Sequence, residues 1–385
     1  MKKLRYGMVG GGQGAFIGAV HRSAMGVDGE FALAAGCFSS SPERSKASGE
    51  ALGVAAERVY GSFDEMAQAE AALPKSERID FVSIVTPNHA HFPAAKTFLE
   101  AGFPVVCDKP VTHSLEQAKA LREIVQSTGQ LFCLTHNYTG YPMVKQARAL
   151  VAAGKLGELR KVVVEYPQGW LGDPIDQEGQ KQASWRTDPE KAGAGGALGD
   201  IGSHAANLVS YIAGLKLESL CADLTSFVPG RKLDDDSNVL VRYQGGAKGV
   251  LYASQISTGE ENALSIRLYG TQGALEWHQE HPNDLHFTPV NEPEQILRPG
   301  NPYLDGHAGG FVRLPAGHPE GFIEAFANVY RCFGKALRAK LDGSFTKVAD
   351  YDFPTIDDGV EGLAFIETAV ASARTEQKWT PVPSV

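Results

Sequence analysis

Short apolar runs alternate with amphipathic segments along the first third of the chain. The apolar runs cover residues 4–9, 31–35, 81–85, 105–107 and 131–135, and segments with helical periodicity cover residues 17–25, 42–52, 90–101 and 115–127. Strands that alternate with helices are typical of βαβ units, which build a parallel sheet. We therefore predict a doubly wound α/β domain over residues 1–140.

The pattern changes after residue 142. One helix is predicted over residues 143–153, followed by strands over 160–166, 220–227, 238–243, 248–254 and 263–269. Neighbouring strands joined by turn pairs such as Gly245-Gly246 favour an antiparallel sheet. A loop-rich segment, 283–318, precedes helices over 320–341 and 358–374. We predict a second, α+β domain over residues 141–385, with an open and mainly antiparallel sheet.

Composition places the chain among ordinary globular proteins. Of its 385 residues, 43% are hydrophobic and 21% charged, and 45 acidic against 36 basic residues give a net charge of -9. An acidic chain lacks the cationic face that nucleic acids require. No apolar run approaches the ~18 residues of a membrane span, and five widely spaced cysteines without a CxxC pair suit reduced thiols rather than disulfides or zinc. We expect a soluble, cytoplasmic protein without nucleic-acid or membrane partners.

A glycine-rich turn follows the first predicted strand and leads into a helix. Glycines in this position allow a tight turn and let backbone N–H groups approach a pyrophosphate at the helix N-terminus. The residues that we assign to a dinucleotide are Gly10, Gly12, Gln13, Gly14 and Ala15. The third glycine of the usual GxGxxG pattern falls on Ala15 or, in an expanded turn, on Gly18. The alternative interpretation is a flexible turn without a ligand.

The end of the second strand bears on the choice of cofactor. No acidic residue stands there to hold a ribose 2'-hydroxyl. Ser39 and Arg44 can instead accommodate a 2'-phosphate, because a hydroxyl avoids repulsion and a guanidinium is a forked donor. Equally, Ser41 and Pro42 can simply begin a helix, as its N-cap and first residue. The cofactor is thus predicted to be NAD(P), with a slight preference for NADP.

Two motifs lie at the carboxyl ends of strands, where open parallel sheets bind ligands. Thr86-Pro87-Asn88-His89 follows strand 81–85, and Asp108-Lys109-Pro110 follows strand 105–107. The residues assigned here to the cofactor site are Thr86, Pro87, Asn88, His91, Asp108 and Lys109. Because a residue before proline is held extended, the backbone aims Lys109, whose ammonium can donate to a substrate oxygen. The alternative is a solvated surface lysine.

In the second domain, Asp200 and His204 stand four residues apart at the start of a predicted helix, on one face of its first turn. They can be metal ligands, an acid–base pair, or a helix cap beside a core histidine. Upstream, Trp185-Arg186 can line a polyol site or form an ordinary turn. The residues that we assign to a substrate site are Lys109, Tyr138, Trp185, Arg186, Asp200, His204 and His318.

Together, the glycine turn, Thr86-Pro87-Asn88-His89, Asp108-Lys109-Pro110 and Gly199-Asp200-Ile201-Gly202-Ser203-His204 resemble the glucose-fructose oxidoreductase / inositol dehydrogenase family, known as Gfo/Idh/MocA. The resemblance spans nearly the whole chain. It implies an N-terminal Rossmann domain, a C-terminal open sheet that forms the substrate face and an oligomer interface, and activity on sugars, cyclitols and their derivatives. Two features depart from the family: its usual Glu-Lys-Pro is Asp108-Lys109-Pro110 here, and the glycine turn is expanded.

The resemblance also implies roles for three residues. Lys109 matches the family's catalytic lysine, Asp200 its substrate-orienting carboxylate and His204 its proton-transferring histidine, which displaces the metal interpretation. We therefore expect an NAD(P)-dependent dehydrogenase of a sugar, glycoside or cyclitol that forms a homodimer or homotetramer. Two alternatives stay open: a glycosidase that oxidises its substrate transiently and eliminates the aglycone, and a sugar or nucleotide sensor without catalysis.

Overall fold

The computed structural model describes residues 2–385, which form two compact units. Unit 1 comprises the chain up to His136 together with Phe326–Val360, and unit 2 comprises Asn137–Ala325 and Glu361–Val385. The first division lies close to the predicted boundary at residue 140. The predicted second domain also includes residues 326–360, however, and the structure places these in unit 1.

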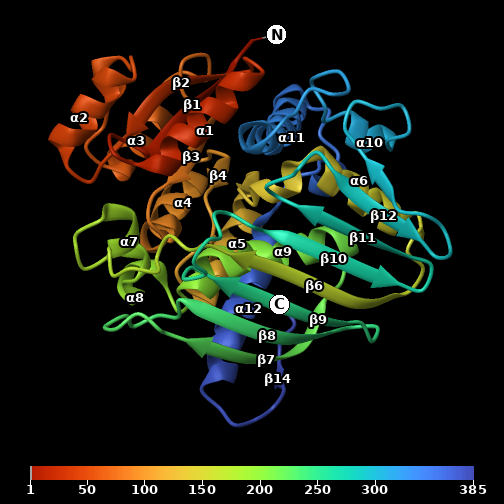
Figure 1. Ribbon diagram of the computed structural model, residues 1–385. Helices are drawn as coiled ribbons and strands as arrows, with labels where there is room; N and C mark the ends of the chain where they lie inside the picture. The colour runs from red at the N-terminus through yellow and green to blue at the C-terminus, as the bar shows by residue number, and fades with distance from the viewer. Residues whose placement is uncertain (1) are drawn as a thin grey trace. The chain divides into compact units, whose positions relative to one another are not determined.

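A five-stranded parallel sheet forms the centre of unit 1 (Figure 1). Its strands are β1 (Leu4–Gly10), β2 (Phe31–Cys37), β3 (Phe81–Val85), β4 (Val105–Cys107) and β5 (Phe132–Leu134), in the order β2-β1-β3-β4-β5. The helical elements of its N-terminal part are α1 (Phe16–Val27), α2 (Pro42–Ala51), η1 (Ala56–Arg58), α3 (Phe63–Ala72), η2 (Asn88–Ala90), α4 (His91–Glu100) and α5 (Leu115–Thr128). The predicted parallel α/β fold is confirmed. Strand order reverses between β1 and β3, the point at which such sheets bind ligands.

Burial explains which elements the apolar pattern reveals. All residues of β3 and β4 are buried, so both strands read as continuous apolar runs. The pattern does not reveal α3, whose buried side includes Glu70. The Glu70 carboxylate accepts hydrogen bonds from Arg58 Nε at 2.7 Å and from Tyr60 Oη at 2.9 Å. In the sequence pattern, a charged residue such as Glu70 therefore indicates a surface position even though its side chain is buried with its partners.

Residues 326–360 complete the core of unit 1. They contain most of α11 (Phe322–Asp342), the turn η5 (Val348–Asp350) and the start of α12 (Ile356–Ala373). On α11, Tyr330 and Phe333 are fully buried, with ring centroids 6.5 and 5.1 Å from that of Phe81 in β3. A segment late in the sequence therefore covers a sheet built from its beginning.

Unit 2 is built on a nine-stranded sheet, seen from olive to cyan in Figure 1. Its strands are β6 (Leu159–Pro167), β7 (Leu217–Thr225), β8 (Asp236–Tyr243), β9 (Lys248–Ser254), β10 (Ser265–Gly270), β11 (Gly273–His278), β12 (Leu285–Pro289), β13 (Gln295–Leu297) and β14 (Thr380–Pro381), in the order β13-β12-β11-β10-β6-β9-β8-β7-β14. All neighbours pair antiparallel except β6 and β9, which pair parallel. The mainly antiparallel prediction is confirmed, although the predicted loop-rich segment 283–318 contains β12 and β13.

Helices cover one face of this sheet and leave the other open. The helical elements are η3 (Asn137–Gly140), α6 (Pro142–Ala152), α7 (Lys181–Arg186), α8 (Pro189–Ala192), the π-helical turn η4 (Leu198–Gly202), α9 (Ser203–Ala213) and α10 (Gly306–Gly309), of which α6 and α9 pack on the strands. Strand register places the exposed side chains of Leu240, Tyr269 and Ile296 on the same, open face, on strands β8, β10 and β13. In the part of the chain that the structure describes, no helix has both the length and the apolar character of a membrane span.

We expect the open face of the sheet to mediate self-association, because it carries the exposed apolar side chains of Leu240, Tyr269 and Ile296. Leu240→Lys places a charge there and should shift the mass measured by light scattering toward that of the monomer. Leu341→Lys is the control, since Leu341 on α11 is 64% exposed and lies outside the sheet. An unchanged oligomer in the Leu240 variant would contradict this assignment of the interface.

Candidate active site

The glycine turn stands at the end of β1, beside the point where strand order reverses. Gly10, Gly11 and Gly14 have φ angles of 83°, 70° and 76°, in the left-handed region that favours glycine. A Cβ on Gly18 would lie 2.3 Å from the Cα of Gly11, so glycine alone lets α1 approach the turn this closely. The third-glycine position is therefore Gly18, and Ala15 is the N-cap residue of α1.

Two residues assigned to the cofactor use their backbone N–H groups inside the protein. Gly12 donates to the carbonyl oxygen of Phe38 at 3.2 Å, and Gln13 donates to Ser48 Oγ at 3.2 Å. The assignment of Gly12 and Gln13 to the cofactor stays a prediction, although these two N–H groups already have partners in the protein. The first turn of α1 offers further N–H groups to a pyrophosphate, because they have no acceptor within the helix.

Ser39 and Arg44 belong to the start of α2. Ser39 Oγ accepts a hydrogen bond from the backbone N–H of Ser41 at 3.2 Å, and Ser41 Oγ accepts one from the N–H of Arg44 at 3.4 Å. Ser41 is the N-cap residue and Pro42 the first residue of the helix, while Arg44 is exposed. These contacts match the interpretation of this segment as a helix start.

The surroundings of Thr86 fit a dinucleotide. Thr86 Oγ1, just after β3, is buried and makes no hydrogen bond to any of residues 2–385. Buried hydroxyls nearly always have a partner. A Cβ on Gly10 would come within 2.9 Å of both Thr86 Cγ2 and the carbonyl oxygen of Val85, so the glycine lets the end of β1 approach the end of β3 closely. An orphaned hydroxyl beside the glycine turn suits a bound NAD at the switch point of the sheet. The neighbouring Pro87 leads into η2, where Asn88 is buried.

Asp108 holds the backbone at Lys109. Its Oδ1 atom accepts a hydrogen bond from the N–H of Lys109 at 3.0 Å and another from Thr135 Oγ1 at 2.7 Å. Thr135 follows β5, so the loop after β4 is fastened to the adjacent strand end. The Asp108 side chain thus supports Lys109 through the backbone, and the half-buried lysine has a defined origin at the carboxyl edge of the sheet.

His91 supports the same loop from another side. Its Nδ1 lies 2.8 Å from the carbonyl oxygen of Pro110, and its Nε2 lies 2.8 Å from that of Thr86. The ring is fully buried, and burial lowers the pKa of His91 despite the opposing effects of Asp108 and the two carbonyls. His91 thus joins two loops, and its assignment to the cofactor site stays a prediction.

Two further buried histidines line this corner of unit 1. Burial and the positive charge of Lys109 lower the pKa of His136 to about 3. Burial also lowers the pKa of His21 to about 4, and its Nδ1 lies 2.7 Å from Tyr330 Oη, which lies 2.8 Å from Ser83 Oγ. Both imidazoles are neutral near pH 7. Sequence reasoning misses the His21 network because Tyr330 comes from α11.

In unit 2, a carboxylate other than Asp200 supports the segment that leads into α9. Asp234 accepts hydrogen bonds from the backbone N–H groups of Gly196 at 2.7 Å and Leu198 at 2.8 Å. Asp200 itself lies inside η4, whose N-cap residue is Ala197. The capping interpretation of Asp200 is therefore wrong, and its carboxylate serves other partners.

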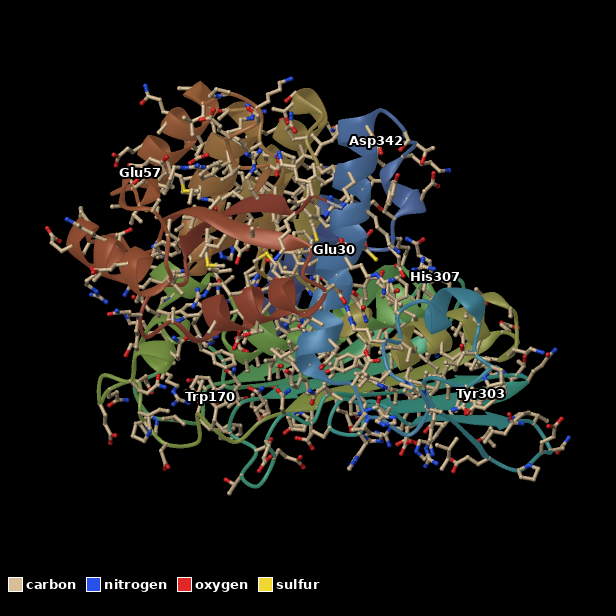
Figure 2. All side chains as sticks on the ribbon, turned by 90° about the horizontal axis from the view of Figure 1, so that it is seen from above. Glu30, Glu57, Trp170, Tyr303, His307 and Asp342 are labelled. Carbon is tan, nitrogen blue, oxygen red and sulfur yellow. The ribbon has the colours of Figure 1, made fainter. Side chains whose placement is uncertain are left out.

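Two side chains bind the carboxylate of Asp200. Its Oδ2 atom accepts hydrogen bonds from Arg186 Nε at 3.0 Å and from Gln255 Nε2 at 2.9 Å. The guanidinium carbon of Arg186 lies 4.2 Å from the ring centroid of Trp185 and 5.9 Å from that of Trp170. Trp170, labelled in Figure 2, is 37% exposed. Gln255 and Trp170 follow the ends of β9 and β6 outside any motif, so sequence reasoning misses both.

His204 stands on α9, four residues after Asp200, and is buried. The ring of Tyr138 meets its imidazole edge-on, with centroids 4.8 Å apart, and the ring of Tyr166 lies 6.3 Å away. The two tyrosine hydroxyls bond to each other, and Tyr166 Oη donates to Asn262 Oδ1 at 2.7 Å. Burial raises the pKa of Tyr138 and of Tyr166. Neutral aromatic rings therefore enclose the imidazole.

The structure does not bring every assigned substrate residue into this cluster. His318 is exposed in the turn that precedes α11. Its Nδ1 lies 3.1 Å from the carbonyl oxygen of Pro315, within the same turn. Among residues 2–385, no hydrogen bond or ring contact links His318 to Asp200 or Arg186.

Two family models match the chain. The model described as an oxidoreductase family with an NAD-binding Rossmann fold covers residues 4–138, and the model of the GFO/IDH/MocA C-terminal domain covers residues 144–276. The chain is also 35% identical to YfiI, an uncharacterized oxidoreductase of Bacillus subtilis (strain 168), over 98% of this chain and 96% of that one. The chain belongs to the GFO/IDH/MocA oxidoreductase family.

Other relatives of this GFO/IDH/MocA protein have named activities or bound ligands. An inositol dehydrogenase homolog from Azotobacter vinelandii matches with a TM-score of 0.94 in complex with NAD+ and 0.92 in complex with NADH and myo-inositol, at 38% and 37% identity. Each match covers 99% of this chain, and 97% and 98% of the two solved chains. Levoglucosan dehydrogenase of Pseudarthrobacter phenanthrenivorans (strain DSM 18606 / JCM 16027 / LMG 23796 / Sphe3) is 25% identical over 100% of both chains. None of these relatives supports the predicted preference for NADP.

The contact between Gly18 and Gly11 predicts how this GFO/IDH/MocA protein responds to substitution. Gly18→Ala should push α1 away from the turn and weaken NADH binding, measured by fluorescence, by about tenfold or more. Gly26→Ala on the same helix is the matched control, because nothing lies within 4 Å of its added Cβ. An equal NADH affinity for the two variants would show that the turn does not shape the cofactor site.

Proposed function

We propose that this protein is an NAD-dependent dehydrogenase that reversibly oxidises a secondary hydroxyl of a sugar, glycoside or cyclitol to a ketone. Membership of the GFO/IDH/MocA family supports the redox chemistry, and the relatives named for inositol and levoglucosan support the class of substrate. The solved relatives that contain NAD+ or NADH support the choice of NAD.

The arrangement around Asp200 carries this proposal. Arg186 and Gln255 hold the carboxylate through its Oδ2 atom. His204, a buried imidazole, follows four residues later on the same helical stretch. An ionised carboxylate accepts hydrogen bonds and donates none, so it can accept one from a substrate hydroxyl, and a nearby imidazole can exchange a proton with a hydroxyl. This combination suits a polyhydroxylated substrate.

Each residue of the site then has a distinct task. When bound, NAD+ supplies the acceptor for the hydride that leaves the substrate carbon. The glycine turn, Thr86 and the first turn of α1 would hold the cofactor. We assign His204 to take the hydroxyl proton, Lys109 to donate a hydrogen bond to the same oxygen and stabilise its developing negative charge, and Asp200 to accept a hydrogen bond from a neighbouring hydroxyl.

Absorbance of reduced nicotinamide tests the proposal directly. The purified protein is incubated with NAD+ and a panel of aldoses, inositols, sugar acids and glycosides, and at least one compound should produce NADH. Release of an aglycone without accumulation of NADH would identify a glycosidase with internal redox chemistry instead. Tight binding of NAD+ without either signal would identify a sensor.

Substitution of the assigned catalytic residues should separate turnover from cofactor binding. We expect Lys109→Met and His204→Gln to lower kcat by about 10²–10⁴ while the affinity for NADH stays within about threefold of normal. Lys96→Met and His278→Gln replace exposed side chains of the same types and are the controls. A normal kcat in either test variant would remove that residue from the mechanism.

The end of β2 decides between the two nicotinamide cofactors. Ser39→Asp brings a carboxylate to the expected position of the ribose, where it would repel a 2'-phosphate and accept a bond from a 2'-hydroxyl. We expect kcat/KM with NADP+ to fall about tenfold relative to NAD+. Ser40→Asp adds the same charge to the next, exposed residue and should leave the ratio unchanged. Equal ratios for the two variants would place the ribose elsewhere.

A further inference from the structure

The guanidinium of Arg186 is committed to partners within unit 2. Its Nε atom donates to Asp200 Oδ2 at 3.0 Å. Its Nη1 atom donates to the backbone carbonyl oxygen of Gln182 at 3.1 Å and to the side-chain Oε1 of Gln182 at 2.9 Å. Trp185 donates to the same Oε1 at 3.4 Å, and its ring packs against the guanidinium. Arg186 is thus bonded on one side to the site carboxylate and on the other to its own helix.

These bonds decide what else Arg186 can bind. A guanidinium grips a carboxylate through two parallel N–H bonds, along either the Nε/Nη2 edge or the Nη1/Nη2 edge. In Arg186 the first edge is already used by Asp200 through Nε, and the second by Gln182 through Nη1. Neither edge can therefore bind a substrate carboxylate through two parallel N–H bonds without breaking an existing bond.

The segment that carries Arg186 is itself anchored. Arg231, whose side chain is almost fully buried, forms ion pairs with Asp176 at 3.0 Å and with Asp235 at 3.3 Å. Ser184 Oγ of α7 lies 2.8 Å from the carbonyl oxygen of Gln180 and 3.2 Å from that of Asp176, and the N–H of Gln180, the N-cap residue of α7, donates to the carbonyl oxygen of Ile175 at 3.2 Å. Helix α7 is therefore tied to the loop between β7 and β8. This anchoring keeps Arg186 beside Asp200 before any substrate arrives.

Charge points in the same direction. Arg186 forms an ion pair with Asp200, and the neutral Gln255 also donates a hydrogen bond to Asp200 Oδ2. A substrate carboxylate next to Asp200 would face a like charge whose cationic partner is already engaged. A neutral hydroxyl, in contrast, can donate directly to the carboxylate.

We propose that Arg186 is a positioning residue that holds Asp200, and that this commitment restricts the site to uncharged polyhydroxylated substrates and excludes sugar acids. The inference rests on the proposed function and deepens it, because it names the charge of the substrate. Arg186 acts through Asp200 and has no contact with the substrate carbon. The two indoles near the guanidinium leave an aromatic surface beside the carboxylate, where the C–H face of a neutral sugar can pack.

Matched substrates and a double substitution test this role. D-glucose and D-glucuronate differ only at the terminal carbon, and we expect the native enzyme to favour the neutral sugar in kcat/KM by about tenfold or more. Arg186→Met should raise KM for D-glucose about tenfold, and Arg186→Lys should raise it less. In an Asp200→Asn background, Arg186→Met should cause no further rise in KM. Arg242→Met, which removes another arginine that packs on an indole, is the control.

Several outcomes would overturn the inference. A native preference for D-glucuronate that Arg186→Met abolishes would make Arg186 the receptor of a substrate carboxylate. An unchanged KM in Arg186→Met, or a full additional loss in the Asp200→Asn background, would show that it does not act through Asp200.

A measurement without turnover keeps this inference separate from the proposed function. In proton–nitrogen correlation spectra, the Nε–H resonance of Arg186 should shift on Asp200→Asn substitution, and calorimetry of the NAD+-loaded protein should show binding of D-glucose in preference to D-glucuronate. If no compound is oxidised, the proposed function fails while these two results still decide the inference. An Arg186 resonance that does not move on Asp200→Asn substitution would overturn the inference. So would stronger binding of D-glucuronate than of D-glucose, or binding of neither compound.

Discussion

His91 makes the contact that best shows how this site is held together. Its two ring nitrogens lie 2.8 Å from backbone carbonyls in two different loops, after β3 and before α5. Asp108 accepts a hydrogen bond from the backbone N–H of Lys109, and Asp234 accepts hydrogen bonds from the backbone N–H groups of Gly196 and Leu198. Buried backbone groups left without partners would cost about 1–3 kcal/mol each. The buried polar side chains remove that cost only when the loops adopt one conformation. That conformation sets the positions of the functional residues on the loops.

The same side chains limit the charge of the site. In unit 1, burial lowers the pKa of His21 to about 4 and, together with the charge of Lys109, that of His136 to about 3, so these two imidazoles add no positive charge around Lys109. In unit 2, the guanidinium of Arg186 is matched by the carboxylate of Asp200. Each unit therefore presents few uncompensated charges to a ligand. This distribution is consistent with chemistry on hydroxyl groups, in which protons move over short distances and the substrate has no charge of its own.

Much of the fold could be predicted from local patterns. Strands β3, β4 and β5 of the parallel sheet are buried throughout, and so appear as apolar runs, and glycine is required where φ is positive or where α1 meets the turn. The prediction failed where burial involves charge or long-range pairing. The sequence pattern does not reveal α3, because buried Glu70 has its hydrogen-bond partners inside the protein, and it does not reveal the short strands β12 and β13, of which β12 pairs with β11 and β13 with β12. The place of residues 326–360 was also beyond the local pattern, because the contact of Tyr330 and Phe333 with Phe81 links distant parts of the chain.

For the site, the sequence by itself determined the residue types and their spacing: a glycine turn after a strand, a lysine before a proline, and an aspartate four residues before a histidine. These motifs are local, so the chain displays them without folding. Only the tertiary structure decided what each side chain does. It shows that Asp200 does not cap a helix and that its carboxylate accepts hydrogen bonds from Arg186 and Gln255. It also shows that His91 connects two loops. The reason is physical, because hydrogen bonds and burial depend on residues that are distant in the sequence and meet only when the sheet forms. The spacing of residues within one segment does not identify these distant partners.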